Sequence, residues 1–260
     1  MESNTISFEI IDSVAKIALN RPDVFNSFNK DMAMAFQAAL DRCETDASVR
    51  AIYLTGSGKA FCAGQDLSEV IDPKGPGIER IVEDHYNPII LRLRKIEKPI
   101  VCAVNGVAAG AGANIALACD VVVAKESCAF IQAFSSIGLI PDSGGTYFLP
   151  RLIGMQKASA LMMLADKIGA AEAAQMGMIY KSIADDQFEE QSWALALKLA
   201  SRPTVGLGLT KRLLNESYQN TLVEQLKREG DEQIAAASSK DYKEGVQAFL
   251  EKRKPTFTGE

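Results

Sequence analysis

Two short stretches rich in small residues could do chemistry with peptide N–H groups rather than with side chains. Residues 61–67 have the sequence Phe-Cys-Ala-Gly-Gln-Asp-Leu, and residues 105–113 have the sequence Asn-Gly-Val-Ala-Ala-Gly-Ala-Gly-Ala. An apolar segment that favours a strand, residues 100–104, precedes the second stretch, and a segment that favours a short helix follows it. N–H groups at a helix N-terminus lack partners and favour negative charge. The sequence therefore predicts that the second stretch holds an oxyanion.

Length and composition limit the classes of protein to consider. The chain has 260 residues, of which 47% are hydrophobic, so it can form one large domain with a buried core. A net charge of −5 argues against general nucleic-acid binding. The N-terminus has no basic region followed by an apolar core, and the apolar stretches are short. We therefore expect a cytoplasmic protein that binds neither nucleic acid nor a membrane.

Cysteine and histidine usage excludes several kinds of site. The five cysteines are odd in number and show no C-x-x-C spacing, so we expect buried thiols without disulfides or zinc. His85 is the one histidine, and a Ser-His-Asp or Cys-His scheme would depend on it alone. It lies in a charged helical segment, which favours a position on the helix surface or at a pocket rim over a catalytic role.

The order of predicted elements indicates the fold class. Residues 6–11 and 14–19 alternate apolar and polar residues, as in a β-hairpin, and Asn29 is placed to cap a helix over residues 30–43. Strands and helices then alternate, which predicts an α/β domain. Residues 203–252 favour helices only, so we predict a core over residues 1–200 and a helical region over 201–260.

A dinucleotide-binding turn is an alternative for the second stretch. After Gly110 and Gly112 that motif requires a third small residue, where this chain has Ile115, and an acidic residue about 20 positions further on. Asp120 comes too early, so a nicotinamide cofactor is not favoured. Tight packing of a helix on a strand remains an alternative role for Gly112.

A third stretch, residues 138–146, has the sequence Gly-Leu-Ile-Pro-Asp-Ser-Gly-Gly-Thr. With the first two, in this order, it resembles the enoyl-CoA hydratase/isomerase, or crotonase, superfamily, and the resemblance extends from about residue 19 to residue 254. It implies a ClpP-like spiral of ββα units, a C-terminal α-helical trimerisation region, and a homotrimer or homohexamer. It also implies an acyl-CoA substrate, no metal, and no cofactor apart from the coenzyme A of the substrate.

The resemblance assigns the oxyanion donors to the main chain. In this family two N–H groups hold the thioester oxygen, and the matching positions here are Gln65 and Ala111. Removing a proton next to a thioester moves negative charge onto that oxygen, which fixed donors stabilise.

The resemblance also separates hydratase from isomerase chemistry. Hydratase members use two glutamates to activate water, and this chain has Asn114 and Phe134 at those positions. Neither is a base at ordinary pH. Asp142 lies near the position of a lone carboxylate that moves protons in isomerase members, and we expect Leu139 and Ile140 to raise its pKa. Judged without the family, Asp142 could instead cap the following helix.

Four segments resemble the family members that isomerise the ring 1,2-epoxide of phenylacetyl-CoA to its oxepin form: residues 64–67, 85–88, 106–112 and 140–142. Relatives of these enzymes move double bonds in enoyl-CoA chains. The expected function is therefore an acyl-CoA isomerase with Asp142 as the catalytic residue. An enoyl-CoA hydratase and a non-catalytic acyl-CoA-binding subunit are the alternatives.

The family pattern also suggests residues that bind coenzyme A. One set, in the N-terminal part of the chain, is Phe25, Asn26, Lys59, Ala63, Asp66 and Leu67. Phe249 and Lys252 match positions that reach the nucleotide of a neighbouring subunit. A solvated helix end is the simpler interpretation of the basic residues 252–254.

Overall fold

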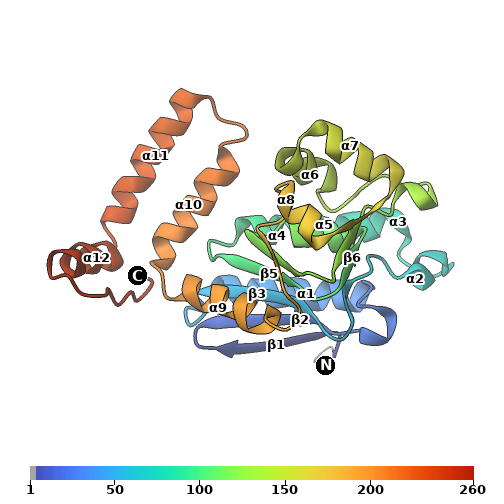
Figure 1. Ribbon diagram of the computed structural model, residues 1–260, viewed down its shortest axis with the longest axis horizontal. Helices are drawn as coiled ribbons and strands as arrows, with labels where there is room; N and C mark the ends of the chain where they lie inside the picture. The colour runs from blue at the N-terminus through green and yellow to red at the C-terminus, as the bar shows by residue number, and fades with distance from the viewer. Residues whose placement is uncertain (1–3) are drawn as a thin grey trace.

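The computed structural model describes residues 4–260, and its core holds two β-sheets wrapped by helices (Figure 1). The larger sheet contains, in spatial order, β1 (Ile6–Ile11), β2 (Val14–Leu19), β3 (Ala51–Gly56), β5 (Ile100–Val104), β7 (Val121–Lys125) and β10 (Lys181–Ile183). The smaller sheet contains β4 (Ala60–Cys62), β6 (Val107–Ala109), β8 (Ala129–Ile131) and β9 (Lys167–Gly169). The predicted hairpin is confirmed, with β1 and β2 antiparallel over the expected residues.

The chain repeats one pattern three times. The pairs β3 and β4, β5 and β6, and β7 and β8 each place one strand in the larger sheet and the next in the smaller sheet. Within each sheet the equivalent strands pair in parallel, and helices follow each pair. This arrangement is the predicted spiral of ββα units, and it confirms the α/β class.

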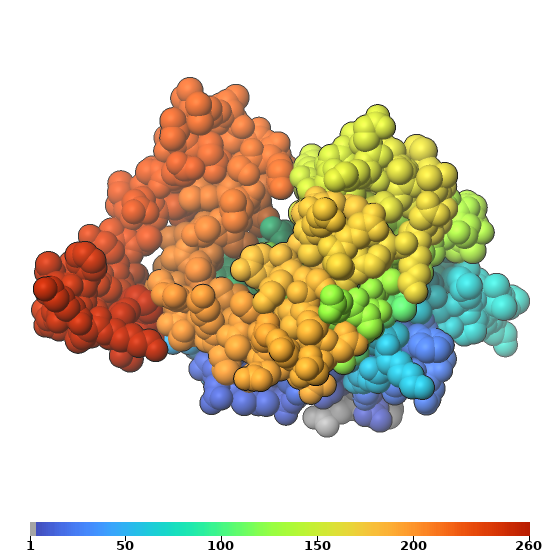
Figure 2. Space-filling model, viewed as in Figure 1, coloured from blue at the N-terminus to red at the C-terminus, as the bar shows by residue number. Residues whose placement is uncertain are grey.

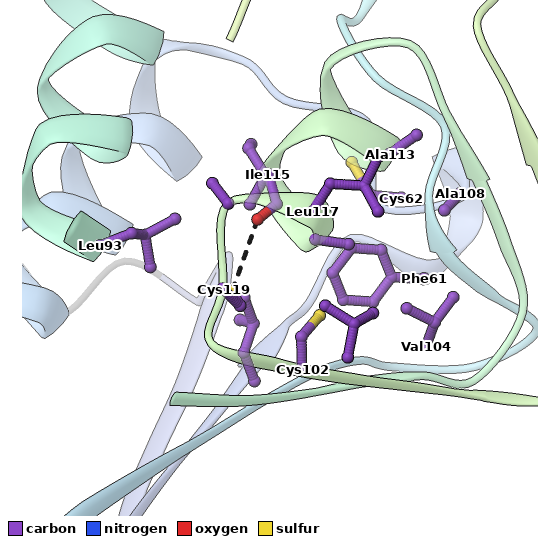
Figure 3. Packing of buried hydrophobic residues seen from close by; sticks show 14 of the residues in the cluster. Phe61, Cys62, Leu93, Cys102, Val104, Ala108, Ala113, Ile115, Leu117 and Cys119 are labelled. Atoms are coloured by element: carbon purple, nitrogen blue, oxygen red, sulfur yellow. Dashed lines mark hydrogen bonds between the residues drawn. The ribbon is translucent and has the colours of Figure 1, made fainter. Parts of the chain in front are cut away.

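Helices cover both faces of the larger sheet. The helices of the core are α1 (Lys30–Thr45), α2 (Leu67–Ile71), α3 (Gly77–Arg80), α4 (Asn87–Lys95), α5 (Ala111–Leu117), α6 (Gly145–Ile153), α7 (Met155–Leu164), α8 (Ala170–Gln175) and α9 (Phe188–Ala200). Neighbouring strand residues point to opposite faces. Ile52 therefore belongs to the main core, whereas Tyr53 belongs to a second cluster with residues of α9. Figure 3 shows the part of the main core where Phe61 and Cys62 pack near Ala113 of α5.

The helical path before α4 is irregular. It runs through α3, a π-helical turn over Ile81–Tyr86, and α4. Pro88 lies in the first turn of α4 and has no N–H to donate to the preceding helical turn, where the carbonyl of Asp84 accepts instead from Gln37 Nε2 at 2.8 Å. The π-helical turn is the true irregularity, and it places His85 and Tyr86 in buried positions.

Three helices after residue 203 form an arm that projects from the core: α10 (Thr204–Glu216), α11 (Leu222–Ala237) and α12 (Lys240–Leu250) (Figures 1 and 2). Lys211 of α10 anchors the arm through an ion pair with Asp120 at 2.8 Å. Asp120 also pairs with Arg94 at 3.2 Å and accepts a hydrogen bond from the Ile100 N–H at 2.9 Å. Asp120, which follows the second glycine-rich motif, therefore ties the arm to β5 and α4.

Candidate active site

The fold brings the two small-residue stretches into contact. Gly64 has a φ of +94°, and a Cβ at this position would lie 3.0 Å from Ala109 O and 3.6 Å from Ala111 N. A Cβ at Gly112 would lie 2.6 Å from the Cβ of Cys62. Glycine is therefore required on both sides of the contact, because any side chain would push the stretches apart.

The two predicted donor peptides both offer an N–H group. Phe28 holds the backbone on both sides of Gln65, since its N–H donates to Gly64 O at 2.7 Å and its carbonyl accepts from Asp66 N at 2.8 Å. The Gln65 N–H donates no hydrogen bond to any of residues 4–260. Ala111 is the first residue of α5, where an N–H has no partner within the helix. The structure thus brings the predicted oxyanion donors together.

Asp142 lies in the loop before α6. Burial raises the pKa of its carboxyl to about 6, although the Ser143 hydroxyl donates to Oδ1 at 2.9 Å and opposes this shift. The predicted direction of the pKa shift is confirmed. Leu139 and Ile140, the apolar neighbours expected to raise this pKa, are themselves 43% and 82% exposed.

The capping alternative for Asp142 is also wrong. Gly144, with a φ of +73°, is the N-cap residue of α6, and no side chain caps this helix. Asp142 supports the turn only with its main-chain oxygen, which accepts from the Gly145 N–H at 2.9 Å. Its carboxylate is therefore available for chemistry.

Two buried amides connect Asp142 to the helix that carries Ala111. Asn114 of α5 donates from Nδ2 to the main-chain oxygen of Asp142 at 2.9 Å. Gln132, which follows β8, donates from Nε2 to Asn114 Oδ1 at 2.8 Å. Gln132 is 2% exposed, and its Oε1 has no hydrogen-bond partner among residues 4–260. A chain of amides thus fixes the acid relative to the donor helix.

Phe134 lies against the second donor stretch. It is 6% exposed, and a Cβ at Gly110 would lie 3.8 Å from its ring. Gly110 directly precedes Ala111 and has a φ of +52°. At the position where the resemblance implies a glutamate in hydratases, this chain therefore has a buried apolar ring, which cannot accept a proton.

Four of the predicted coenzyme A residues meet in one region. The Ala63 N–H donates to Phe25 O at 3.0 Å, and Phe25 and Leu67 are 57% and 55% exposed. Asn26 is fully buried, and its amide binds the main chain at Arg21, Ser57 and Ala60. A ligand can thus reach Phe25, Ala63 and Leu67, whereas the Asn26 side chain shapes the loop beneath them.

The remaining predicted coenzyme A residues differ in their surroundings. Asp66 caps α2 and forms an ion pair with Arg21 at 2.9 Å. Partial burial acts to raise the pKa of its carboxyl, but hydrogen bonds from Ser68 and Arg21 outweigh it and hold the pKa below the usual value. Lys59 is exposed in the turn before β4. Phe249 and Lys252 belong to the arm, at the opposite end of the molecule from α2 (Figure 1). The chain therefore does not bring its own Phe249 and Lys252 to the site.

His85 and the cysteines occupy buried positions. His85 is 3% exposed and lines a cavity of about 640 Å³, so the surface alternative is wrong and the pocket-rim position is the one that the structure shows. Burial lowers the pKa of His85. All five cysteines are buried and unpaired, and burial raises the pKa of Cys62 to about 12, which makes it a poor nucleophile.

Residues 4–260 contain neither a metal-binding cluster of side chains nor a helix that could span a membrane. No cluster of three or more His, Cys, Asp or Glu residues in this range could hold a metal ion. In the same range no helix has the length and apolar character needed to cross a bilayer.

Two residues near the site were missed by sequence reasoning. Tyr86 is fully buried and its hydroxyl donates to Gln65 Oε1 at 2.8 Å, and Gln132 holds Asn114. A buried tyrosine needs a hydrogen-bond partner, but nothing in the sequence indicates a partner 21 residues away.

Comparisons with known proteins agree on one family. A family model described as enoyl-CoA hydratase/isomerase matches residues 9–260. The 1,2-epoxyphenylacetyl-CoA isomerase of Escherichia coli K12 is 47% identical over 249 residues, covering 95% of both chains. A Rhodobacter capsulatus protein named as a probable enoyl-CoA hydratase is 46% identical over 259 residues, covering all of both chains.

Solved structures show the same architecture. The crystal structure of an enoyl-CoA hydratase from Bacillus anthracis superposes with a TM-score of 0.91 at 33% identity, covering 98% of this chain and all of that one. The predicted spiral and its helical C-terminal region are thereby confirmed as this fold. The names of the two similar relatives differ in reaction, so the choice between them depends on the site.

Proposed function

This chain is an enzyme of the enoyl-CoA hydratase/isomerase family, and we propose on this basis that it isomerises acyl-CoA thioesters by moving a proton within the acyl group. The proposed substrates are the ring 1,2-epoxide of phenylacetyl-CoA, which would become oxepin-CoA, and enoyl-CoA chains whose double bond shifts. The observation that carries the proposal is the chemistry of Asp142. It is a partly buried carboxyl with a pKa near 6, linked through Asn114 to the helix that begins at Ala111.

The proposed reaction divides the work between main chain and side chain. The Gln65 and Ala111 N–H groups hold the thioester oxygen, and the Asp142 carboxylate takes a proton from the carbon next to the thioester. The electron pair of the broken C–H bond moves onto the thioester oxygen as an enolate. Protonated Asp142 then returns the proton to another carbon, so substrate and product have the same composition. Each oxyanion donor is worth roughly 2.7–4 kcal/mol in comparable sites.

A substrate panel in heavy-oxygen water tests this proposal. The purified enzyme is incubated with the ring epoxide, a 3-enoyl-CoA and a 2-enoyl-CoA, and the products are analysed by mass spectrometry. We expect products of unchanged mass from the first two and little label in the third. Rapid incorporation of heavy oxygen into the 2-enoyl-CoA would support a hydratase instead, the alternative suggested by the name of the 46% identical relative.

We also propose that the enzyme is cytoplasmic and needs no cofactor apart from the coenzyme A of its substrate. Phe25, Ala63 and Leu67 would contact coenzyme A directly, with Lys59 near its phosphates. Full activity after treatment with a chelator and gel filtration would support the absence of a cofactor. Loss of activity that an added metal restores would contradict it.

The exposed surface of the arm suggests that the protein forms an oligomer. Its exposed apolar side chains include Val223 at 78%, Ile234 at 71% and Phe249 at 83% exposure. Apolar side chains on so small an arm favour contact with another subunit. We propose a homotrimer or homohexamer in which Phe249 and Lys252 reach the coenzyme A of a neighbour. Light scattering measures the mass, and Lys252→Ala should raise KM without changing kcat.

A further inference from the structure

We propose that Tyr86 and Glu69 clamp the side chain of Gln65, and that this clamp directs the Gln65 N–H toward the thioester oxygen. The inference rests on the proposed function, because it explains how one of its two donors is positioned. Tyr86 and Glu69 are positioning residues in this scheme, since they act on the substrate only through Gln65.

Both polar atoms of the Gln65 side chain are engaged. Tyr86 Oη donates to Gln65 Oε1 at 2.8 Å, and Gln65 Nε2 donates to Glu69 Oε2 at 2.8 Å. Glu69 is fixed in turn, because its Oε1 accepts from the Lys30 N–H at 2.8 Å, at the start of α1. A carboxamide held from both ends cannot rotate without breaking a hydrogen bond.

The main chain around Gln65 has a matching constraint. Phe28 and Gln65 form a parallel bridge in which Phe28 binds the peptide oxygen of Gly64 and the N–H of Asp66. In such a bridge the N–H of the central residue points away from the partner strand. The bridge therefore turns the Gln65 N–H away from Phe28, and the side-chain clamp opposes rotation of this peptide about its neighbours.

The π-helical turn carries Tyr86, the residue that contacts Gln65. Tyr86 ends this turn, is fully buried, and packs edge-on against Phe28 with ring centroids 5.8 Å apart. Burial raises the pKa of Tyr86 well above 10, so its hydroxyl keeps the proton that it donates. Such turns are rare and frequently occur at functional sites. The same Phe28 thus contacts the tyrosine and pairs with the donor segment.

Tyr86→Phe removes the hydroxyl and keeps the ring. Because a misplaced donor weakens polarisation of the thioester more than binding, we expect kcat to fall about tenfold with KM changed less than about twofold. Tyr53→Phe is the matched control. Tyr53 is also buried and its hydroxyl also has a side-chain partner, Ser192 Oγ at 2.9 Å, but it packs in the cluster beneath α9.

A chromophoric probe separates positioning from a general loss of structure. Cinnamoyl-CoA absorbs at longer wavelength when its thioester carbonyl is polarised, so bound probe reports on the two donors. We expect a red shift with the wild-type enzyme and with Tyr53→Phe, and a smaller shift with Tyr86→Phe at similar affinity. Glu69→Ala should reduce the shift. Glu69→Gln should restore only part of it, because its single amide oxygen can accept from Gln65 Nε2 or from the Lys30 N–H but not from both.

The outcomes distinguish the clamp from the proposed function. A red shift of wild-type size in both Tyr86→Phe and Glu69→Ala, with unchanged kcat, would overturn the clamp and leave the proposed function standing. Absence of any shift with the wild-type enzyme, despite binding of cinnamoyl-CoA, would contradict thioester polarisation and overturn both.

Discussion

The two halves of the candidate site use different parts of the chain. The donor half, Gln65 and Ala111, offers peptide N–H groups set in a core where Phe61, Cys62 and Ala113 are fully buried (Figure 3). The acid half is the Asp142 side chain, on a loop that also carries the 82% exposed Ile140. One half depends on packing and the other on a single carboxylate.

This difference determines which substitutions matter. A peptide donor has no side chain to delete, so it is sensitive to neighbours that would displace the backbone. A side-chain acid is lost in a single substitution that leaves the fold intact. Substitutions in the two halves should therefore differ in how they affect turnover and stability.

Asp142→Asn should have the largest effect. An amide cannot accept the proton, and general acid–base catalysis is worth about 10²–10⁴-fold, so we expect a loss of kcat in this range with substrate binding retained. Asp166→Asn, an exposed aspartate with no assigned role, is the control. Turnover of a 3-enoyl-CoA at the wild-type rate by Asp142→Asn would remove the acid half from the mechanism.

Gly64→Ala should damage the donor half. The new Cβ would lie 3.0 Å from Ala109 O in a backbone with a φ of +94°, so the peptide of Gln65 must move. A displacement of about 1 Å can cost roughly 100-fold in rate. Gly77→Ala is the matched control, because Gly77 has a φ of +72° but nothing within 4 Å of the new Cβ. Steady-state kinetics of both should show a large loss only for Gly64→Ala; equal losses would mean that backbone strain, not crowding, is responsible.

The pH dependence should come from the acid half alone. Asp142 must be ionised to accept a proton, and burial raises its pKa to about 6. We therefore expect kcat/KM to be constant above about pH 7 and to fall about tenfold per pH unit well below pH 6. A profile that stays flat down to about pH 4.5 would contradict the assigned pKa.

The smallest expected effect is on stability. Asp142→Asn should raise the free energy of unfolding while it lowers activity. Burial raises the pKa of Asp142 from 3.8 to about 6 in the folded protein. Below pH 3.8 the carboxyl is protonated in both states and the folded protein bears no penalty. As the pH rises through 6 the folded protein must hold a buried charge, and that stability is lost. Above pH 6 the buried charge is a cost that Asp142→Asn removes. We expect this variant to gain on the order of 1–3 kcal/mol in unfolding free energy at about pH 8 and little at about pH 4, measured by urea denaturation.

Local sequence patterns predicted the helices and strands that are specified by their own residues. The hairpin β1–β2 and the helix α1 with its Asn29 cap have the predicted positions, because alternation and capping are read from adjacent residues. The strand β6 was missed, since Val107–Ala109 form a strand only by pairing with β4 and β8. The π-helical turn before α4 was also missed.

The candidate site was also predictable only in part. Gln65, Ala111 and Asp142 lie in motifs that could be matched residue by residue, whereas their supports depend on contacts between distant segments. Tyr86 reaches Gln65 across 21 residues, and Asn114 reaches Asp142 across 28. Such contacts follow from the spiral, not from any local pattern of the sequence.

A crystal structure of the Asp142→Asn variant with an unreacted 3-enoyl-CoA tests the division of labour between the two halves. We predict the thioester oxygen within about 3.2 Å of both Gln65 N and Ala111 N, with the carbon next to the thioester facing the carboxamide introduced at position 142. A bound substrate whose thioester oxygen points away from both nitrogens would contradict the account.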